Sequence, residues 1–203
     1  MNMTRTIIAD DHSVVLTGLS MMLTASGKYT VVGTASDGQE LINLSNTLEA
    51  DLILIDYRMP LLNGIDALLV LQKKCKAKLV FITSYTDEWL VAKAKNLGAT
   101  GVICKTADRD LLLSALDKVM KGEKIFPTDE EIYNRLYNPL KNKYKLTESE
   151  TSTIKDIRNG LGVKEIAKKN NLSPETVKTH KKNAFEKLGI NKITMLSQFL
   201  NRF

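Results

Sequence analysis

The stretch that most constrains the fold is Leu52–Ile55, four consecutive branched apolar residues that are followed at once by Asp56. Such a run is typical of a strand buried on both faces, as strands are in a parallel sheet. In open α/β sheets, reactive groups lie at the carboxyl ends of the strands, where Asp56 would stand. An aspartate that merely leads a strand into a turn explains the same pattern, because Pro60 and Asn63-Gly64 follow as loop signals. The rest of the chain has to decide between the two interpretations.

Five short apolar runs recur through the first half of the chain, and segments with helical spacing separate them. The runs are Thr6–Ala9, Tyr29–Gly33, Leu52–Ile55, Lys78–Thr83 and Gly101–Cys104. The clearest helical stripe consists of Leu111, Leu112, Ala115, Leu116, Val119 and Met120. This alternation predicts an α/β fold with a doubly wound, five-stranded parallel sheet, and right-handed crossovers would gather the functional loops at its carboxyl edge. His12 is expected to help start the first helix rather than to act in catalysis.

Polar residues stand at the carboxyl ends of four of these strands. They are Asp10 and Asp11 after the first strand, Asp56 after the third, Thr83 and Ser84 at the fourth, and Lys105 after the fifth. Three carboxylates at one edge repel one another, and Mg²⁺ is a hard cation that takes carboxylate, water and phosphate oxygens as ligands. A threonine hydroxyl and a lysine ammonium suit phosphate oxygens, and an aspartate can accept a phosphoryl group. The edge therefore has the parts for phosphoryl transfer to Asp56.

The chain is long enough for two small domains, and its last third differs in charge from the rest. Residues 1–122 carry 13 Lys and Arg and 13 Asp and Glu, whereas residues 145–203 carry 12 Lys and Arg and 6 Asp and Glu. The whole formal excess of +6 thus falls in the last third, as expected of a part that meets a polyanion. Loop signals at Gly122, Asn138-Pro139 and residues 141–145 predict a linker over residues 123–144, with a short helix at 129–137. The expected domains are residues 1–122 and 145–203.

Residues 145–203 show four helical segments and no strand signal. Thr147 and Glu150 form a capping box for the first helix, and residues 164–169 form a short second helix. Ser173-Pro174 begins a third helix, which Gly189 ends, and a last helix covers residues 194–200. A short helix, a tight turn and a longer basic helix make a helix-turn-helix. This part is therefore predicted to be a small all-α domain that binds double-stranded DNA.

The long basic helix has two distinct faces. Steps of about 100° per residue put Val177, Ala184 and Leu188 on one stripe, which is the face expected to enter the core. A separate arc, suited to a DNA groove, carries Lys178, Thr179 and Lys182. A solvated lysine face on a small helical domain explains the same charges.

Together, the residues at the sheet edge resemble those of the receiver domain of two-component response regulators. The resemblance covers residues 4–121 and rests on Asp10-Asp11, Asp56-Tyr57-Arg58-Met59-Pro60, Thr83-Ser84 and Lys105. It implies that Asp56 accepts a phosphoryl group from the histidine of a sensor kinase. It implies that Asp11, Asp56 and the backbone carbonyl of Arg58 bind Mg²⁺, while Asp10 helps through water. It also implies that Thr83 and Lys105 contact the phosphoryl oxygens.

The second part resembles the LuxR-type DNA-binding domain over about residues 145–203. The matching segments are Leu146–Glu150, Lys164–Ala167, Leu172–His180 and Lys187–Ile190. By this resemblance Lys178, Thr179 and Lys182 reach bases, whereas Thr176, Lys181 and Lys187 lie nearer phosphates. The two parts together resemble response regulators of the NarL/FixJ class, in which phosphorylation releases or dimerises the DNA-binding domain. The implied partners are a sensor histidine kinase, double-stranded DNA, a second copy of the chain and RNA polymerase.

One position departs from the receiver pattern. Receivers usually carry Tyr or Phe three residues before the lysine, as the aromatic that moves with the threonine, and this chain has Val102 there. We therefore expect a weaker or rerouted conformational switch.

Val102 also favours a second function, in which DNA binding does not depend on phosphorylation and the receiver serves dimerisation or docking. A third function is an Asp-nucleophile phosphatase, but its Asp-x-Asp motif needs a second Asp where this chain has Arg58. The favoured function is a transcription factor and not an enzyme.

Neither the start of the chain nor its cysteines indicate a secreted or membrane protein. No run of 18 apolar residues is present, and the first residues lead directly into a strand. Cys75 and Cys104 form no CxxC pair, which favours free thiols in a reducing compartment. The chain is expected to be cytoplasmic and to have no membrane partner.

Overall fold

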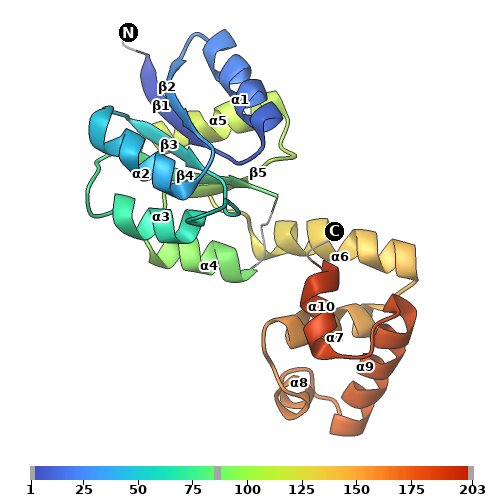
Figure 1. The fold of residues 1–203 in the computed structure, drawn as a ribbon. Coiled ribbons are helices and arrows are strands. Elements are labelled where there is room, and N and C mark those ends of the chain that lie inside the picture. The colour runs from blue at the N-terminus through green and yellow to red at the C-terminus, as the bar shows by residue number, and fades with distance from the viewer. Residues whose placement is uncertain (1–2, 85–87, 201–203) are drawn as a thin grey trace. The chain divides into compact units, whose positions relative to one another are not determined.

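Five parallel strands form one sheet in the computed structural model of the chain, which describes residues 3–84 and 88–200 (Figure 1). The strands are β1 (Thr4–Ala9), β2 (Tyr29–Ala35), β3 (Leu52–Ile55), β4 (Lys78–Thr83) and β5 (Gly101–Cys104). Their order is β2-β1-β3-β4-β5, and every neighbouring pair is parallel. This is the flavodoxin-like order of a doubly wound sheet, so the predicted α/β fold is confirmed.

Helices cover both faces of this sheet (Figure 1). One face carries α1 (Ser13–Ala25) and α5 (Arg109–Met120), and the other carries α2 (Gly38–Thr47), α3 (Gly64–Leu71) and α4 (Glu88–Asn96). Leu54 packs in a core cluster with Leu23 of α1 and Leu116 of α5, and all three side chains are fully buried. All four residues of β3 are buried, which explains why this strand reads as a continuous apolar run rather than an alternating one.

The last part of the described chain is entirely helical. Its helices are α6 (Asp129–Tyr144), α7 (Glu148–Arg158), α8 (Val163–Lys169), α9 (Pro174–Leu188) and α10 (Ile193–Leu200). The predicted caps are present: Thr147 and Glu150 form a capping box, and the Ser173 side chain accepts from the backbone N–H of Thr176. Gly189 ends α9 in the left-handed conformation, with φ of 66°. None of the helices in residues 3–84 and 88–200 is long and apolar enough to cross a lipid bilayer.

The expected linker is where the structure departs most from the sequence prediction. The chain divides into two units at Pro127 and Thr128, earlier than the boundary expected at residue 145. Helix α6 continues through Pro139, although the loop signal there predicted that the helix would stop at residue 137. The reason is burial: Tyr137 and Leu140 are 3% and 0% exposed in the core of the second unit. This burial outweighs the hydrogen bond that a proline removes from a helix. Residues 141–144 are the last turn of α6 rather than an irregular connection.

Candidate functional site

The ladder of the sheet places two buried carboxylates side by side at its carboxyl edge. The backbone N–H of Asp56 donates to the carbonyl of Ala9 at 2.8 Å, and that of Asp10 donates to the carbonyl of Ala35 at 3.0 Å. Each aspartate therefore continues its strand by one residue and has little freedom to move. Asp10 is 1% exposed and Asp56 is 4% exposed. Carboxylates are rarely buried this far without a partner of opposite charge.

Lys105 is the shared partner of both carboxylates. Its Nζ lies 2.7 Å from Asp10 Oδ2 and 2.8 Å from Asp56 Oδ2. Burial raises the pKa of Asp56, although the hydrogen bond and the charge of Lys105 oppose that rise. Burial by itself would lower the pKa of Lys105, but the bonds to Asp10 and Asp56 outweigh it and leave that pKa raised. One ammonium group thus compensates two carboxylates, and the edge keeps an excess of negative charge.

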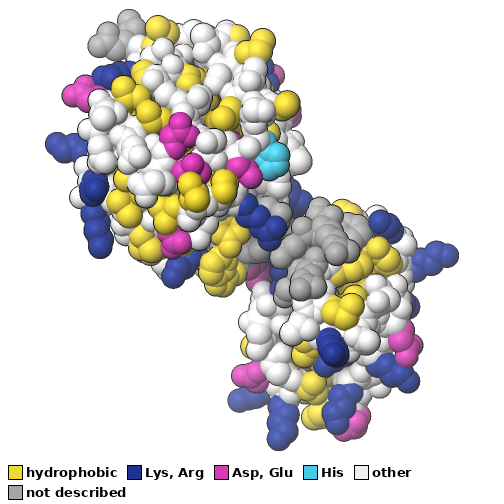
Figure 2. Space-filling model, viewed as in Figure 1, with side chains coloured by type: hydrophobic (Ala, Val, Ile, Leu, Met, Phe, Trp, Pro, Cys, Tyr) yellow, Lys and Arg dark blue, Asp and Glu magenta, His cyan; other side chains and the backbone are white. Residues whose placement is uncertain are grey.

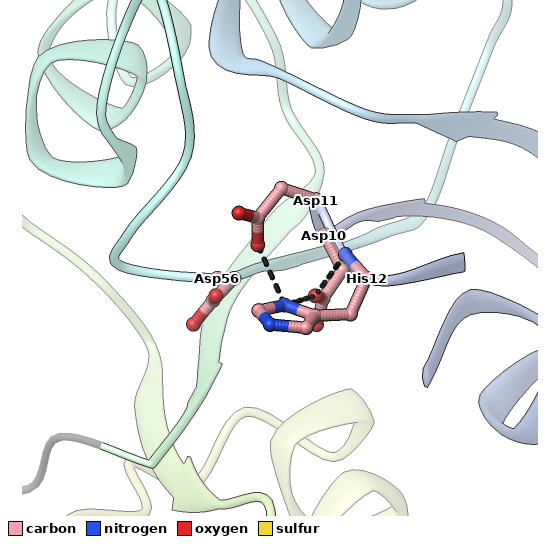
Figure 3. Close-up of side chains that lie close together, drawn as sticks. All are labelled: Asp10, Asp11, His12 and Asp56. Carbon is pink, nitrogen blue, oxygen red and sulfur yellow. Dashed lines mark hydrogen bonds and ion pairs between the residues drawn. The ribbon is translucent and has the colours of Figure 1, made fainter. Parts of the chain in front are cut away.

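Asp11 and His12 complete the cluster on its exposed side (Figure 3). The His12 Nδ1 lies 2.7 Å from Asp11 Oδ1 and 3.2 Å from Asp10 Oδ1. His12 is the N-cap residue of α1, as expected, because its carbonyl accepts from the N–H of Val15. Its side chain makes no capping bond and faces the carboxylates instead, which the sequence did not reveal. One ligand atom from each of the residues that Figure 3 draws lies within 4.8 Å of the others.

The remaining residues predicted for this site surround Asp56. Thr83 is fully buried at the end of β4, and its side chain hydrogen bonds with Asp56 and lowers the pKa of that carboxyl. Arg58 is exposed in the loop after β3. That loop is drawn close to the strand by Gly64, where a Cβ would lie 2.1 Å from the carbonyl oxygen of Asp56. Gly64 is therefore required for this close approach, and is not only a turn signal. Val102 is 2% exposed in β5.

The second unit presents the predicted arc of α9 to solvent. Val177, Ala184 and Leu188 are at most 4% exposed, so the expected core face of this helix is confirmed. Lys178 and Lys182 are exposed, and each lies near a glutamate of the same helix. The Lys178 Nζ lies 2.9 Å from Glu175 Oε1, and the Lys182 Nζ lies 3.8 Å from Glu186 Oε1. Such exposed pairs contribute about 0–1 kcal/mol, so they leave both amines available to another anion.

Thr179 is also exposed on α9, whereas Lys181 and Thr176, which lies near the helix start, are half-buried. The Thr179 hydroxyl donates to the carbonyl of Glu175 at 3.0 Å, and Thr176 lies 2.8 Å from the Ser173 hydroxyl. The Lys181 Nζ lies 5.4 Å from the ring centroid of Phe185. Figure 2 shows Lys and Arg side chains projecting from the surface of the second unit, as the charge of its sequence indicates.

Lys187 was predicted to lie near a DNA phosphate, and in the structure its ammonium contacts residues before and at the start of α7. Its Nζ donates to Glu150 Oε2 at 2.6 Å and to the carbonyl of Lys145 at 3.1 Å. Nine residues separate it from Lys178, so the two side chains point to opposite sides of α9. Glu150 is buried, and the bond to Lys187 lowers its pKa against the opposing effect of burial. The ammonium of Lys187 therefore holds α9 to the start of α7.

Asp156 is a buried charge that the sequence analysis missed. It is 1% exposed on α7, and its carboxylate accepts from Lys169 Nζ at 2.5 Å and from the Asn170 side chain at 3.0 Å. These bonds fasten α7 to the end of α8, just before the turn that leads to α9. The only feature of the sequence that indicated burial of Asp156 was its position next to Ile157, on the buried stripe of the helix.

Comparisons with known proteins give the same division into two parts. Residues 6–117 match the family model described as the response regulator receiver domain, and residues 144–200 match that of the bacterial regulatory proteins of the luxR family. The transcriptional regulatory protein YdfI of Bacillus subtilis is 31% identical over 197 residues, covering 95% of this chain and 92% of the relative. The response regulator protein VraR of Staphylococcus aureus is 30% identical over 191 residues, covering 92% and 90%.

Solved structures of relatives are similar as well. RcsB from Salmonella enterica serovar Typhimurium, bound to a promoter in the presence of the phosphomimetic BeF₃⁻, has 28% sequence identity and a TM-score of 0.60. That match covers 98% of both chains. A structure of a response regulator RcsB–DNA complex has 29% identity and a TM-score of 0.61, again with 98% of both chains covered. The chain therefore belongs to the response regulators of the NarL/FixJ class, with a receiver domain followed by a LuxR-type DNA-binding domain that serves transcription regulation.

Proposed function

We propose that transfer of a phosphoryl group to Asp56 from a sensor histidine kinase controls sequence-specific DNA binding by α9. The observation that carries this proposal is the position of the Asp56 carboxylate, which is 4% exposed and lies 2.8 Å from Lys105, the lysine that also binds Asp10. A structural aspartate at a strand end does not need a second buried carboxylate beside it. The excess negative charge favours a site that works with an added cation.

The transfer is a displacement at phosphorus. An oxygen of Asp56 forms a bond to phosphorus as the bond between phosphorus and the kinase histidine nitrogen breaks, and the imidazole leaves with the electron pair. The product is an acyl phosphate on Asp56. Lys105 and the Thr83 hydroxyl are positioned beside Asp56 to contact the phosphoryl oxygens. Such transfer depends mainly on positioning and charge neutralisation, which rigid strand ends supply.

The donor atoms at this edge fit Mg²⁺. Asp11, Asp56 and the backbone carbonyl of Arg58 would hold the ion, and Asp10 would act through water. Carboxylate oxygens within 4.8 Å of one another are the ligands that a hard divalent cation prefers. When bound, the ion would offset the charge of the incoming phosphoryl group. The side chains themselves position Asp56 and bind the phosphoryl oxygens.

For the second unit we propose that Lys178, Thr179 and Lys182 read base edges in the major groove, with Thr176 and Lys181 nearer the phosphates. We leave Lys187 out of this set, because its ammonium is bound to Glu150. Pairs of such helices from a phosphorylated homodimer would read paired half-sites. RcsB is described as binding DNA as dimers, which supports the same arrangement here. Contact with RNA polymerase would follow from transcription regulation.

The first experiment is to incubate the chain with Mg²⁺ and acetyl phosphate and to record its intact mass. We expect one phosphoryl group on the parent chain and none on Asp56→Asn, which keeps the size of the side chain. An adduct on both proteins would place the acceptor elsewhere. No adduct on either, repeated with candidate kinases, would remove the basis for phosphorylation control.

The DNA-binding half is tested by affinity for a selected operator and for unrelated DNA. Lys178→Ala should weaken binding to the operator by about 1–3 kcal/mol and relax its sequence preference if the amine pairs with a base. Lys187→Ala is the matched control, since it should lower the stability of the unit without changing that preference. An equal loss on all DNA would make Lys178 a phosphate contact.

A second candidate function is favoured by Val102, which is β-branched, buried and unable to act as a moving aromatic. In that function the receiver is a dimerisation or docking module, and DNA binding is independent of phosphorylation. Asp56→Asn distinguishes the two: loss of regulation supports phosphorylation control, and unchanged regulation supports the docking module.

A further inference from the structure

The outer edge of β5 is covered by the segment that follows α5. The N–H of Ile125 donates to the carbonyl of Thr100 at 3.0 Å, and the carbonyl of Ile125 accepts from the N–H of Val102 at 2.8 Å. Gly101 and Ile125 form a parallel bridge. We call residues 124–127 the edge strap. It covers strand groups that an edge strand otherwise leaves unpaired.

Side chains fix the edge strap against the receiver domain. Ile125 packs against the core cluster beneath α1 and α5. The Lys95 Nζ of α4 lies 4.9 Å from the ring centroid of Phe126. Gly101 allows the close approach, because a Cβ at this position would lie 2.8 Å from the carbonyl oxygen of Ile125. The strap ends immediately before Thr128, the N-cap residue whose capping box with Glu131 begins α6.

The other edge of β5 pairs with β4, whose last residue, Thr83, contacts Asp56. Val102 lies opposite Phe81, and Cys104 lies opposite Thr83 of β4. The N–H of Lys105 donates to the carbonyl of Thr83 at 3.1 Å, and its Nζ binds Asp56. Two residues of one strand, Ile103 and Cys104, therefore separate Lys105 from Val102, which bonds to the edge strap.

We propose that β5 transmits the state of Asp56 through its backbone to the edge strap, and that the strap in turn controls the start of α6. A phosphoryl group on Asp56 draws Lys105 and Thr83 towards its oxygens, and both residues stand at the ends of strands in this ladder. The resulting shift of β5 changes the two bonds to Ile125. Val102 takes part through its N–H, so no aromatic side chain is required. The inference rests on the proposed phosphorylation of Asp56, and it gives the physical element that such coupling needs.

Hydrogen exchange tests the first step in the chain with both of its domains. Beryllofluoride with Mg²⁺ serves as the phosphoryl mimic, and exchange is measured at the amides of Val102 and Ile125. We expect their exchange rates to change by about tenfold or more, because both bonds lie in the element that opens or closes. Asp56→Asn should show no change. Unchanged exchange in a parent chain that has bound the mimic would overturn the proposal and leave phosphorylation itself intact.

Two substitutions at one position test the second step. Ile125→Pro removes the N–H that binds Thr100, whereas Ile125→Ala keeps both backbone bonds and loses only side-chain contacts. Phosphorylation should change the DNA affinity of the parent chain by about 5–150-fold, the usual range of allosteric coupling. That ratio should fall towards one in Ile125→Pro and persist in Ile125→Ala, while both variants still accept one phosphoryl group at Asp56.

Gly101→Ala provides an independent route if Ile125→Pro does not fold. Its Cβ displaces the carbonyl of Ile125 and should also bring the ratio towards one. A full ratio in Gly101→Ala or in folded Ile125→Pro would exclude the strap as the route. A parent chain that takes up the phosphoryl group but shows no change in DNA affinity contradicts the proposed function instead.

Discussion

The two units each bury an aspartate beside a lysine, and the two arrangements differ in charge. Asp156 is 1% exposed and has Lys169 and Asn170 as its own partners, at 2.5 and 3.0 Å. Asp56 is 4% exposed, but it shares Lys105 with Asp10. The Asp156 carboxylate is therefore fully compensated, whereas one positive charge serves two carboxylates at the sheet edge.

We infer from this difference that Asp156 is a structural buried charge and that Asp56 belongs to a reactive site. A buried ion pair whose remaining lone pairs are also satisfied holds two elements together and has no need of a ligand. At the sheet edge the deficit of positive charge raises the energy of the folded protein, and an added cation would relieve it. Burial alone would not distinguish the two aspartates. The number of carboxylates that share the one lysine does.

The largest expected effect comes from removing the shared lysine. Lys105→Met leaves Asp10 and Asp56 buried with no cation between them, and we expect the receiver domain to lose about 3–5 kcal/mol of stability at neutral pH. Urea unfolding of the variant measures this loss. Lys169→Met is the matched control and should cost less, because Lys169 is half-exposed and Asn170 remains bonded to Asp156. A larger loss in Lys169→Met would contradict the comparison.

Removing Asp156 should have the next largest effect, and it should act on the second unit alone. Asp156→Ala leaves the Asn170 amide without its acceptor, while Lys169 can turn to solvent. We expect a loss of about 1–3 kcal/mol, the usual cost of an unsatisfied buried group. Thermal unfolding measures the loss of stability. Hydrogen exchange, compared between the two units, assigns that loss to α7 and α8. Increased stability of Asp156→Ala would mean that this charge has no structural function.

The sheet-edge half of this comparison could be predicted from the sequence. Strands buried on both faces are marked by continuous apolar runs, and parallel order follows from the alternation with helices. Once the order is known, the residues after each strand must share one edge. Asp10, Asp56 and Lys105 therefore came together as expected, since their contacts depend on backbone topology more than on side-chain packing. His12 was the exception, because its ring direction depends on a local rotamer.

The helical half was less predictable, because packing overrides local signals there. Pro139 predicted the end of a helix, but Tyr137 and Leu140 are buried on either side of it and keep α6 continuous. Lys187 belongs to a basic helix and has the charge of a DNA contact, yet it pairs with buried Glu150. Helical caps were predicted well because they involve residues three positions apart. Contacts between separate helices leave no such trace in one sequence.

A third prediction concerns Asp56 itself: its replacement should stabilise the protein, whereas replacement of Asp156 should destabilise it. Asp56→Asn removes one of the two charges that share Lys105 and keeps the shape of the side chain. We expect the variant to be more stable than the parent by about 1 kcal/mol at neutral pH, although most core substitutions destabilise. Chemical denaturation without Mg²⁺ measures the gain. Asp10→Asn should give a gain as well if the shared lysine is the cause.

The smallest effect is the pH dependence of that gain, and its sign follows from the raised pKa of Asp56. A carboxyl whose pKa is higher in the folded than in the unfolded chain binds its proton more tightly when folded, so its ionisation disfavours folding. The stability difference between Asp56→Asn and the parent should be widest above the folded pKa of Asp56. It should narrow as the pH falls through that value and vanish below the unfolded pKa of about 3.9. The raised pKa of Lys105 does not interfere, because that group stays protonated throughout this range.

Unfolding of both proteins in a pH series without Mg²⁺ provides the measurement. A difference that widens on acidification would mean that Asp56 is stabilised by its charge, as a structural ion pair is, and the distinction from Asp156 would fail.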